Sequence, residues 1–395
     1  MSAKQASPLR ANSPRYGHAI RPLWPLDPTV TYLNHGGYGA TPLVVLAEQD
    51  RWRLRLEAEP THFMQRELPD ALRAAAATLA DFLGAEPTDL AFVQNATDGV
   101  NAVLRSLDLS PGDEMLTTTH VYPAVRNAMR FVAARTGARI VEAPLPYPLA
   151  DPDAALQAFA SHLTGRTRLA LFDFVTSPTA LLLPAAAMAR AAHEVGAKVL
   201  LDAAHAPGMV DFRLDALGAD WVTGNAHKWL FAPKGTAFLW ADRDAQKGLH
   251  PTVISHGFEQ GFRAEFDWVG TRDPSGWLAI DAAIAFYRAQ GDGAIRAYNR
   301  ALADQAAALI AEALGSDQGQ SAACRGALAT VRLPGTRGQD RAAGLALNDW
   351  LWREHRIEVP IIAFADWLWV RVSAQIYNEI GDYERLAAAL RSRPA

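Results

Sequence analysis

Two short stretches of the sequence place acidic, histidine and lysine side chains directly after apolar runs typical of β-strands. The first stretch, LLDAAHAPG, contains Asp202 and His205. The second stretch, TGNAHKWL, contains Asn225, His227 and Lys228. If the two apolar runs are strands of one parallel sheet, an acid and a lysine stand at the carboxyl ends of those strands, where ligands of such sheets gather.

The combination of a buried acid with a buried lysine favours one cofactor. A buried carboxylate is unfavourable without a positive partner, and a buried lysine is unfavourable unless it is neutral or covalently engaged. Pyridoxal phosphate meets both conditions, because its aldehyde forms a Schiff base with a lysine and its protonated ring nitrogen pairs with an acid. Taken singly, Asp202 could be an ordinary helix N-cap and Lys228 a surface lysine at a strand end.

Short β-type runs alternate with alanine-rich helical runs through the first two thirds of the chain. The β-type runs include LAFVQ, RLALFDFV, KVLLDA and GTAFLWAD. This alternation predicts an α/β fold with a mainly parallel sheet between two layers of helices. We expect an extended, proline-rich N-terminal arm over residues 1–30, a large cofactor-binding domain over 31–290 and a small C-terminal α+β domain over 291–395.

Composition excludes several classes of function. The 395 residues carry a formal net charge of −4 without a basic stripe, so we expect no nucleic-acid partner and no membrane surface. A single cysteine, Cys324, excludes an intramolecular disulfide and fits the cytoplasm, and no signal peptide is recognisable. P-loop, HExxH and GxSxG motifs are missing, so we expect no metal site and no serine hydrolase.

Three motifs together resemble a known family. DAAHAPG, GNAHKWL and WVRVSAQIYN resemble the class V aminotransferases, which are fold-type I pyridoxal-phosphate enzymes, and in particular their isopenicillin N epimerase-like branch. The resemblance runs from about residue 30 to the end of the chain and implies a large domain with a sheet of the seven-stranded type. It implies that Lys228 forms the Schiff base, that Asp202 pairs with the ring nitrogen and that His205 contacts the phenolic oxygen of the ring.

The turn in QNATDGVNAVL is the expected phosphate site. Asn95, Ala96 and Thr97 lie between a β-type run and a helix, and the first amides of a helix have no intrahelical partner. The resemblance places the cofactor's phosphate on this turn, with Asn225 and His227 reaching it from the lysine loop. Ordinary helix capping by the same turn remains an open alternative.

Two further segments bear on the cofactor by resemblance. Tyr122 in TTTHVYPAV is expected to stack on the cofactor ring, with His120 as the second candidate. Thr271 in WVGTRDPSG is expected to reach the phosphate of a second subunit, which implies a homodimer with shared active sites. A capped surface loop is the alternative for the second segment.

An amino-acid substrate needs a partner for its carboxylate. Arg371 alternates with Val370 and Val372 on a β-type run, and the resemblance makes its planar fork the carboxylate clamp. A salt-bridged arginine on a half-exposed strand is the alternative. In YLNHGGYGATP, the residues Asn34, His35 and Gly36 resemble a segment that lines the substrate entrance.

The reaction expected from these residues begins with removal of the Cα proton by Lys228. Epimerisation is the leading expectation, transamination starts from the same step, and a C–S or other β-lyase is the alternative. A cysteine desulfurase is disfavoured, because the segment before the Arg371 strand has no cysteine and Cys324 lies too early in the chain. From another class, a non-catalytic protein of the same fold stays open, although the complete set of Lys228, Asp202 and Arg371 argues against it.

Overall fold

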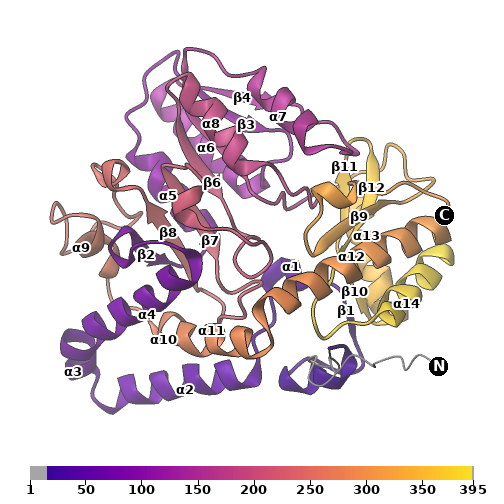
Figure 1. Cartoon of the computed structure of the whole chain (residues 1–395), viewed down its shortest axis with the longest axis horizontal. Coiled ribbons are helices and arrows are strands. Elements are labelled where there is room, and N and C mark those ends of the chain that lie inside the picture. Colours follow the sequence, from indigo (N-terminus) through magenta and orange to yellow (C-terminus); the bar gives the residue numbers. More distant parts are fainter. Residues whose placement is uncertain (1–15, 394–395) are drawn as a thin grey trace, which may run out of the picture.

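The computed structural model describes residues 16–393 and is built around a seven-stranded sheet (Figure 1). The strand order is β2-β8-β7-β6-β5-β3-β4, and only β8 runs antiparallel to its neighbours. The expected α/β fold with a mainly parallel sheet is therefore confirmed. The strands are β2 (Leu90–Val93), β3 (Glu114–Thr118), β4 (Arg139–Ala143), β5 (Thr167–Asp173), β6 (Lys198–Asp202), β7 (Trp221–Asn225) and β8 (Ala237–Ala241).

Helices cover both faces of this sheet, because its strands are apolar on both sides. Leu171 and Leu200 pack on one face under α5, α6 and α9, whereas Phe172 and Leu201 pack on the other face under α4, α7, α8 and α11. This strand alternation separates the core into two layers. The helices are α2 (Leu43–Ala58), α3 (Pro60–His62), α4 (Leu68–Leu83), α5 (Ala96–Ser106), α6 (Pro123–Thr136), α7 (Pro152–Ala160), α8 (Ala185–Glu194), α9 (Phe262–Asp267), α10 (Ser275–Leu278) and α11 (Ile280–Ala289).

A smaller α+β unit follows, on the right of Figure 1. Its antiparallel sheet has the order β11-β12-β9, and β10 pairs with β1 from the start of the chain. The domain boundaries predicted from the sequence stay predictions. The elements are β1 (Thr31–Tyr32), α1 (His35–Tyr38), α12 (Asp292–Leu314), β9 (Leu328–Arg332), α13 (Arg341–His355), β10 (Ile357–Glu358), β11 (Ile361–Phe364), β12 (Trp367–Ser373) and α14 (Ile380–Arg391).

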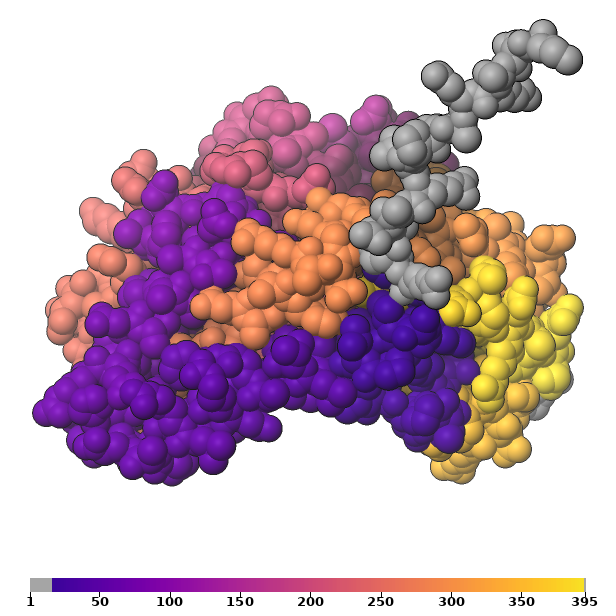
Figure 2. Space-filling view, turned by 60° about the horizontal axis from the view of Figure 1, so that its bottom comes forward, coloured from indigo at the N-terminus to yellow at the C-terminus, as the bar shows by residue number. Residues whose placement is uncertain are grey.

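The described part of the N-terminal segment is packed, which corrects the expectation of an extended arm over residues 1–30. A 3₁₀ helix spans His18–Leu23, and the amide of Gly17 donates to the carbonyl of Ile376 at 2.7 Å. Trp24 is 3% exposed, because its ring packs against three other aromatic rings. Figure 2 shows this indigo segment against the yellow C-terminal elements. Residues 1–15 lie outside the described residues.

Two kinds of feature are absent from residues 16–393. No helix in this range is long and apolar enough to cross a membrane. In the same range, no group of three or more histidine, cysteine, aspartate or glutamate side chains could hold a metal ion. Cys324 is buried as a free thiol beside the small sheet.

Candidate active site

A cavity of about 510 Å³ opens at the carboxyl edge of the parallel strands. Strand β6 ends there at Asp202, β7 ends three residues before Lys228, and α5 begins there. The chain thus brings the two quoted motifs and the predicted phosphate turn to one place. The predicted residues that line the cavity are Asn95, Ala96, Thr97, Tyr122, Asp202, His205, Asn225, His227 and Lys228.

The lysine side chain is held by a histidine whose tautomer the structure fixes. Trp229 Nε1–H donates to Nδ1 of His205 at 3.3 Å, so the proton of the neutral imidazole lies on Nε2. This Nε2 is 3.2 Å from Nζ of Lys228. Burial, with the charge of Lys228 as the next cause, holds the pKa of His205 well below its usual value, so the imidazole is neutral. When Lys228 is in its neutral form, the Nε2–H of His205 donates to Nζ.

The lysine is poised to act as a neutral nucleophile or base. Burial is the main cause that lowers the pKa of Lys228 from 10.5 to about 8, and the positive charge of Arg371 is the second. Asp202 acts in the opposite direction. A buried lysine beside another cation is a recognised form of activated amine.

Asp202 is the acidic residue predicted to pair with the cofactor's ring nitrogen, and it lines the cavity. Its side chain is 3% exposed, and Oδ1 accepts a hydrogen bond from the amide of Ala204 at 2.9 Å. Burial raises the pKa of Asp202, while the Ala204 amide and the charge of Lys228 oppose this shift. The carboxylate is thus desolvated and has room for a cationic partner on the cavity side.

The start of α5 forms the opposite end of the cavity. Asn95 caps the helix by accepting the amide of Asp98, and the amide of Ala96 donates to Oδ1 of Asn225 at 2.8 Å. The Ala96 amide is therefore engaged, which corrects the expectation that it is a free phosphate donor. The Thr97 amide, as the next orphan donor of the helix, and the side-chain amide of Asn225 remain as donors at this end.

His227 lies beside this end of the cavity. Its Nδ1 bonds to the carbonyl of Thr236 at 3.0 Å, so Nδ1 carries a proton. Burial first, and the charge of Lys228 second, lower the pKa of His227 to about 4. His227 is thus neutral before an anion arrives, and a bound phosphate would favour its protonated form.

A second cavity of about 720 Å³ adjoins the first, and Tyr122 and Ser177 line both. It lies between the two units and contains Arg371 and Asn34. Arg371 is 5% exposed, and its Nη1 donates to the carbonyl and hydroxyl oxygens of Ser177. Its Nε has no hydrogen-bond partner, and no carboxylate among the described residues pairs with it. Burial lowers the pKa of Arg371 to about 10, so the guanidinium is a desolvated cation facing an open cavity.

His35 and Gly36 do not line either cavity, which corrects their expected place at the substrate entrance. His35 is fully buried and bridges the hydroxyl of Tyr377 at 2.7 Å and the carbonyl of Lys228 at 3.0 Å. A Cβ on Gly36 would lie 2.9 Å from a methyl carbon of Leu328, so this glycine permits close packing. Both residues support the lysine loop from behind.

The remaining candidates differ in their surroundings. Tyr122 is 41% exposed and lines both cavities, whereas His120 is buried, bonds to Thr179 Oγ1 at 2.7 Å and lines neither cavity. The position of Tyr122 is compatible with a stacking role. Thr271 is exposed and lines neither cavity of its own chain, so its predicted role in a second subunit stays a prediction.

Comparison with known proteins places this site in a family. A model of the family "Aminotransferase class-V" matches residues 31–386. The chain belongs to the class V aminotransferase family. It is 36% identical over 390 residues to isopenicillin N epimerase of Amycolatopsis lactamdurans, covering 93% of this chain and 96% of the relative. It is 32% identical over 397 residues to putative L-cysteine desulfhydrase 1 of Oryza sativa subsp. japonica, covering 91% of this chain and 82% of the relative.

Solved structures of pyridoxal-phosphate enzymes share the fold. The cystine C–S lyase C-DES, in complex with its product cysteine persulfide, matches with a TM-score of 0.76 and 23% identity over 93% of this chain and 99% of that one. A C-DES variant with glycine covalently linked to its PLP cofactor matches with a TM-score of 0.78 and 22% identity over 95% and 99% of the two chains. These findings confirm the predicted family resemblance, fold class and cofactor: the protein is a pyridoxal-phosphate-dependent class V enzyme.

The residues of the cavity fit this cofactor. Donors for a phosphate lie at the start of α5, and a desolvated acid for the ring nitrogen ends β6. Lys228 lines the cavity and could form the Schiff base with the cofactor's aldehyde, and the partly exposed ring of Tyr122 forms an aromatic part of the cavity wall.

Sequence reasoning missed several residues of this cavity, and three of them bear on its chemistry. Asp173 ends β5 beside Asp202, Ser177 holds Arg371, and Lys234 is a second lysine on the wall. An acid within the apolar run RLALFDFV was a usable signal, because the same unfavourable burial singled out Asp202. Ser177 and Lys234 carry no comparable local signal.

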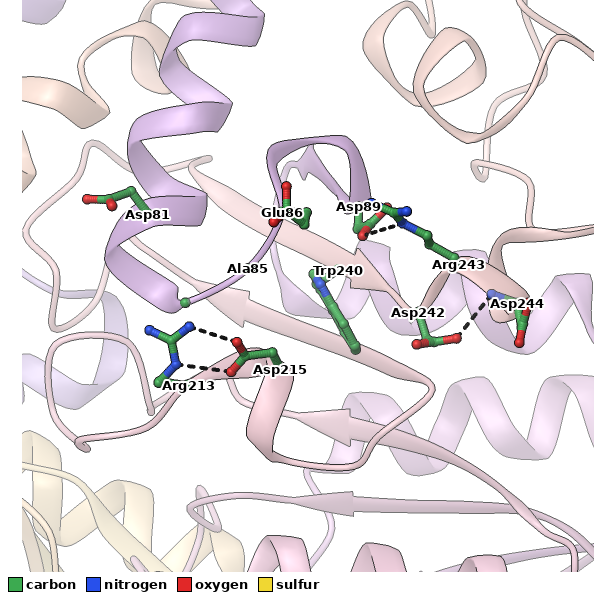
Figure 3. Close-up of a pocket in the computed structure, with 11 residues that line it drawn as sticks. Asp81, Ala85, Glu86, Asp89, Arg213, Asp215, Trp240, Asp242, Arg243 and Asp244 are labelled. Atoms are coloured by element: carbon green, nitrogen blue, oxygen red, sulfur yellow. Dashed lines mark hydrogen bonds and ion pairs between the residues drawn. The ribbon is translucent and has the colours of Figure 1, made fainter.

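A pocket of about 630 Å³ at the other edge of the sheet is a poor alternative site (Figure 3). It lies where β2 begins and β8 ends, away from the carboxyl ends of the parallel strands. Its two arginines already pair with acids of the same wall, Arg213 with Asp215 and Arg243 with Asp89. Figure 3 shows these pairs spanning its wall.

The lowered pKa of Lys228 predicts how cofactor attachment depends on pH. Only the neutral amine attacks an aldehyde, so we expect the attachment rate for cofactor-stripped protein to rise with pH and reach half of its plateau near pH 8. In Arg371→Leu the midpoint should move to higher pH, because a cation that lowers this pKa is removed. Stopped-flow absorbance with added pyridoxal phosphate measures the rate, with Nα-acetyl-lysine amide as reference. A midpoint near 10.5 in the wild-type protein would contradict the expectation.

Close packing of α5 on β7 predicts a second effect. A Cβ on Gly99 would overlap Oγ1 of Thr223, so Gly99→Ala should push the start of α5 out of place. We expect pyridoxal phosphate to bind about 5- to 150-fold more weakly, because overpacking typically costs 1 to 3 kcal/mol. Fluorescence titration measures the affinity. Gly165→Ala is the matched control, since a Cβ there meets no atom within 4 Å. Equal affinity in both variants would show that α5 does not position the phosphate.

Proposed function

We propose that the enzyme removes the Cα proton of an amino acid and that a proton from solvent adds to the opposite face of the same carbon, so that the product is the epimer. Arg371 carries this proposal. A buried guanidinium without an acidic partner faces the cavity next to Lys228, and the planar fork of arginine binds a carboxylate with two parallel hydrogen bonds. A substrate carboxylate would complete this ion pair.

Each cavity residue then has a separate task. Pyridoxal phosphate, when bound, would supply the electron sink for the pair of electrons that the departing proton leaves on Cα. Nζ of Lys228, with its pKa lowered to about 8, accepts that proton, and Nε2 of His205 orients Nζ from 3.2 Å. The carboxylate of Asp202 stabilises the proton on the ring nitrogen.

Elimination from a small sulfur-containing amino acid is the second candidate, because several relatives are named L-cysteine desulfhydrases. The size of the Arg371 cavity favours a larger substrate. Its volume of about 720 Å³ falls in the range of sites for drug-sized ligands, and the partly exposed residues 362–364 of β11 give it an apolar wall. A long side chain would fill this space, whereas the side chain of cysteine would leave most of it to water.

Incubation of the enzyme with a panel of L-amino acids in D₂O tests the proposal. We expect deuterium at Cα and accumulation of the D-epimer for amino acids with long side chains, measured by mass spectrometry and chiral chromatography. L-Cysteine should yield little sulfide or pyruvate. Release of both from cysteine, with no inversion of any amino acid, would replace the epimerase proposal by elimination.

The proposed active unit is a homodimer in which Thr271 serves the site of the other subunit. Thr271 is exposed in the loop before α10 and reaches neither cavity of its own chain, which supports this assignment. The test is sedimentation of the enzyme together with pyridoxal phosphate affinity of Thr271→Ala. A monomer with unaltered affinity in the variant would contradict it.

A further inference from the structure

A second buried carboxyl group lies beside Asp202. Asp173 ends β5 as Asp202 ends β6, and the two residues are paired in the register of these parallel strands. Both side chains lie on the sheet face that α5 and α6 cover, because they follow Leu171 and Leu200 at a spacing of two. Asp173 is 2% exposed and lines the same cavity as Lys228.

The surroundings of Asp173 suit a protonated carboxyl group. Its Oδ2 is buried without a hydrogen-bond partner among the described residues, which is unfavourable for an ionised oxygen. Burial is the main cause that raises the pKa of Asp173 well above its ordinary value, and repulsion from Asp202 adds to it. The backbone amide of Asp173 itself, the Tyr122 amide and the charge of Lys228 oppose this rise without reversing it.

Two adjacent buried carboxyl groups do not both ionise readily, so they share one proton. Asp202 is the better place for the negative charge. Its Oδ1 accepts the Ala204 amide at 2.9 Å, and the charge of Lys228 favours its ionised form. The shared proton is therefore more stable on Asp173, where Oδ2 has no other hydrogen-bond partner and can bind it.

We propose that Asp173 is a positioning residue that stays protonated and donates a hydrogen bond to Asp202, keeping Asp202 ionised and fixed as the partner of the cofactor's ring nitrogen. The inference rests on the proposed role of Asp202. It does not depend on which reaction follows Cα deprotonation.

Two variants of Asp173 distinguish the effect of its hydrogen bond to Asp202 from the effect of its side-chain volume. Asp173→Asn keeps a hydrogen-bond donor of nearly the same shape, whereas Asp173→Val keeps the bulk and cannot donate. We expect Asp173→Asn to bind pyridoxal phosphate within about threefold of wild type. Asp173→Val should bind it on the order of tenfold more weakly, since a hydrogen bond to a charged group is lost, and should shift the pH dependence of the bound cofactor's absorbance. Equilibrium dialysis and spectrophotometric titration measure these two quantities.

Infrared spectroscopy of the loaded enzyme locates the proton directly. The carbonyl-stretch band of a buried carboxylic acid should be present in the wild type at neutral pH and missing in Asp173→Asn. Glu265→Gln is the control, because Glu265 is 5% exposed, accepts a hydrogen bond from His250 at 2.6 Å and does not line the cavity, so the band should remain in this variant.

The proposal requires two results. The carboxylic-acid band must disappear in Asp173→Asn, and Asp173→Asn must keep the affinity for pyridoxal phosphate that Asp173→Val loses. Equal weakening in both variants, unaltered binding in the valine variant, or a band that persists in Asp173→Asn would each overturn it. None of these measurements uses turnover, so their failure leaves the epimerase proposal untouched. Conversely, a missing inversion of amino acids would overturn that proposal alone.

Discussion

Replacement of Lys228 by alanine is expected to abolish covalent attachment of pyridoxal phosphate and all measurable turnover. Nζ of Lys228 is both the attachment point and the proposed base, and its hydrogen bond with His205 places it over the cavity. Loss of a positioned general base alone reduces a rate by about 10²- to 10⁴-fold, and loss of the attached cofactor adds to this. The readouts are the visible absorbance of the enzyme and mass spectrometry after borohydride reduction.

A second lysine on the same cavity provides the control. Lys234 also lines the cavity, its pKa is also lowered by burial, and its Nζ donates to Oγ1 of Thr41 at 3.3 Å. Lys234→Ala should keep the reducible covalent bond, with the label on the peptide that contains Lys228. A label that survives in Lys228→Ala and disappears in Lys234→Ala would show that the attachment point was assigned to the wrong lysine.

The sequence allows Asp202 and Lys228 to be singled out because both follow apolar runs directly. Parallel strands end at one edge of their sheet, so residues that follow two such runs meet without any knowledge of the tertiary contacts. The alternation of strands with helices likewise predicts the layers of the large unit. What each residue does with the cofactor stays a prediction for both.

Other features depend on contacts between distant segments and leave no local pattern. His35 was expected at the substrate entrance, yet it is buried because Tyr377 and the carbonyl of Lys228 supply partners for both ring nitrogens. Asp173 lies beside Asp202 only because of the register of β5 against β6, which the sequence does not reveal. The proline-rich start of the chain looked extended, but Trp24 finds an aromatic cluster contributed by much later residues.

Replacement of Arg371 by leucine is also expected to have a large effect, because the variant should no longer bind the carboxylate of the substrate. A charge-assisted, two-bond contact in a desolvated site is worth about 2 to 5 kcal/mol, which corresponds to roughly 30- to several-thousand-fold in affinity. Arg371→Lys should restore only part of it, because an ammonium group cannot form two parallel bonds. Titration of the bound cofactor's absorbance with an accepted amino acid, and with the matching amine that lacks the carboxylate, measures the preference.

The stability of Arg371→Leu separates the clamp from a structural role. Arg371 is a buried cation without an acidic partner among the described residues, and such a charge destabilises the folded protein. Leucine should therefore leave the melting temperature unchanged or raise it, while the preference for the carboxylate is lost. Arg332→Leu is the control on the neighbouring strand, because Arg332 pairs with Asp317 and faces neither cavity. A strongly lowered melting temperature with the carboxylate preference intact would show that Arg371 is structural and that the clamp lies elsewhere.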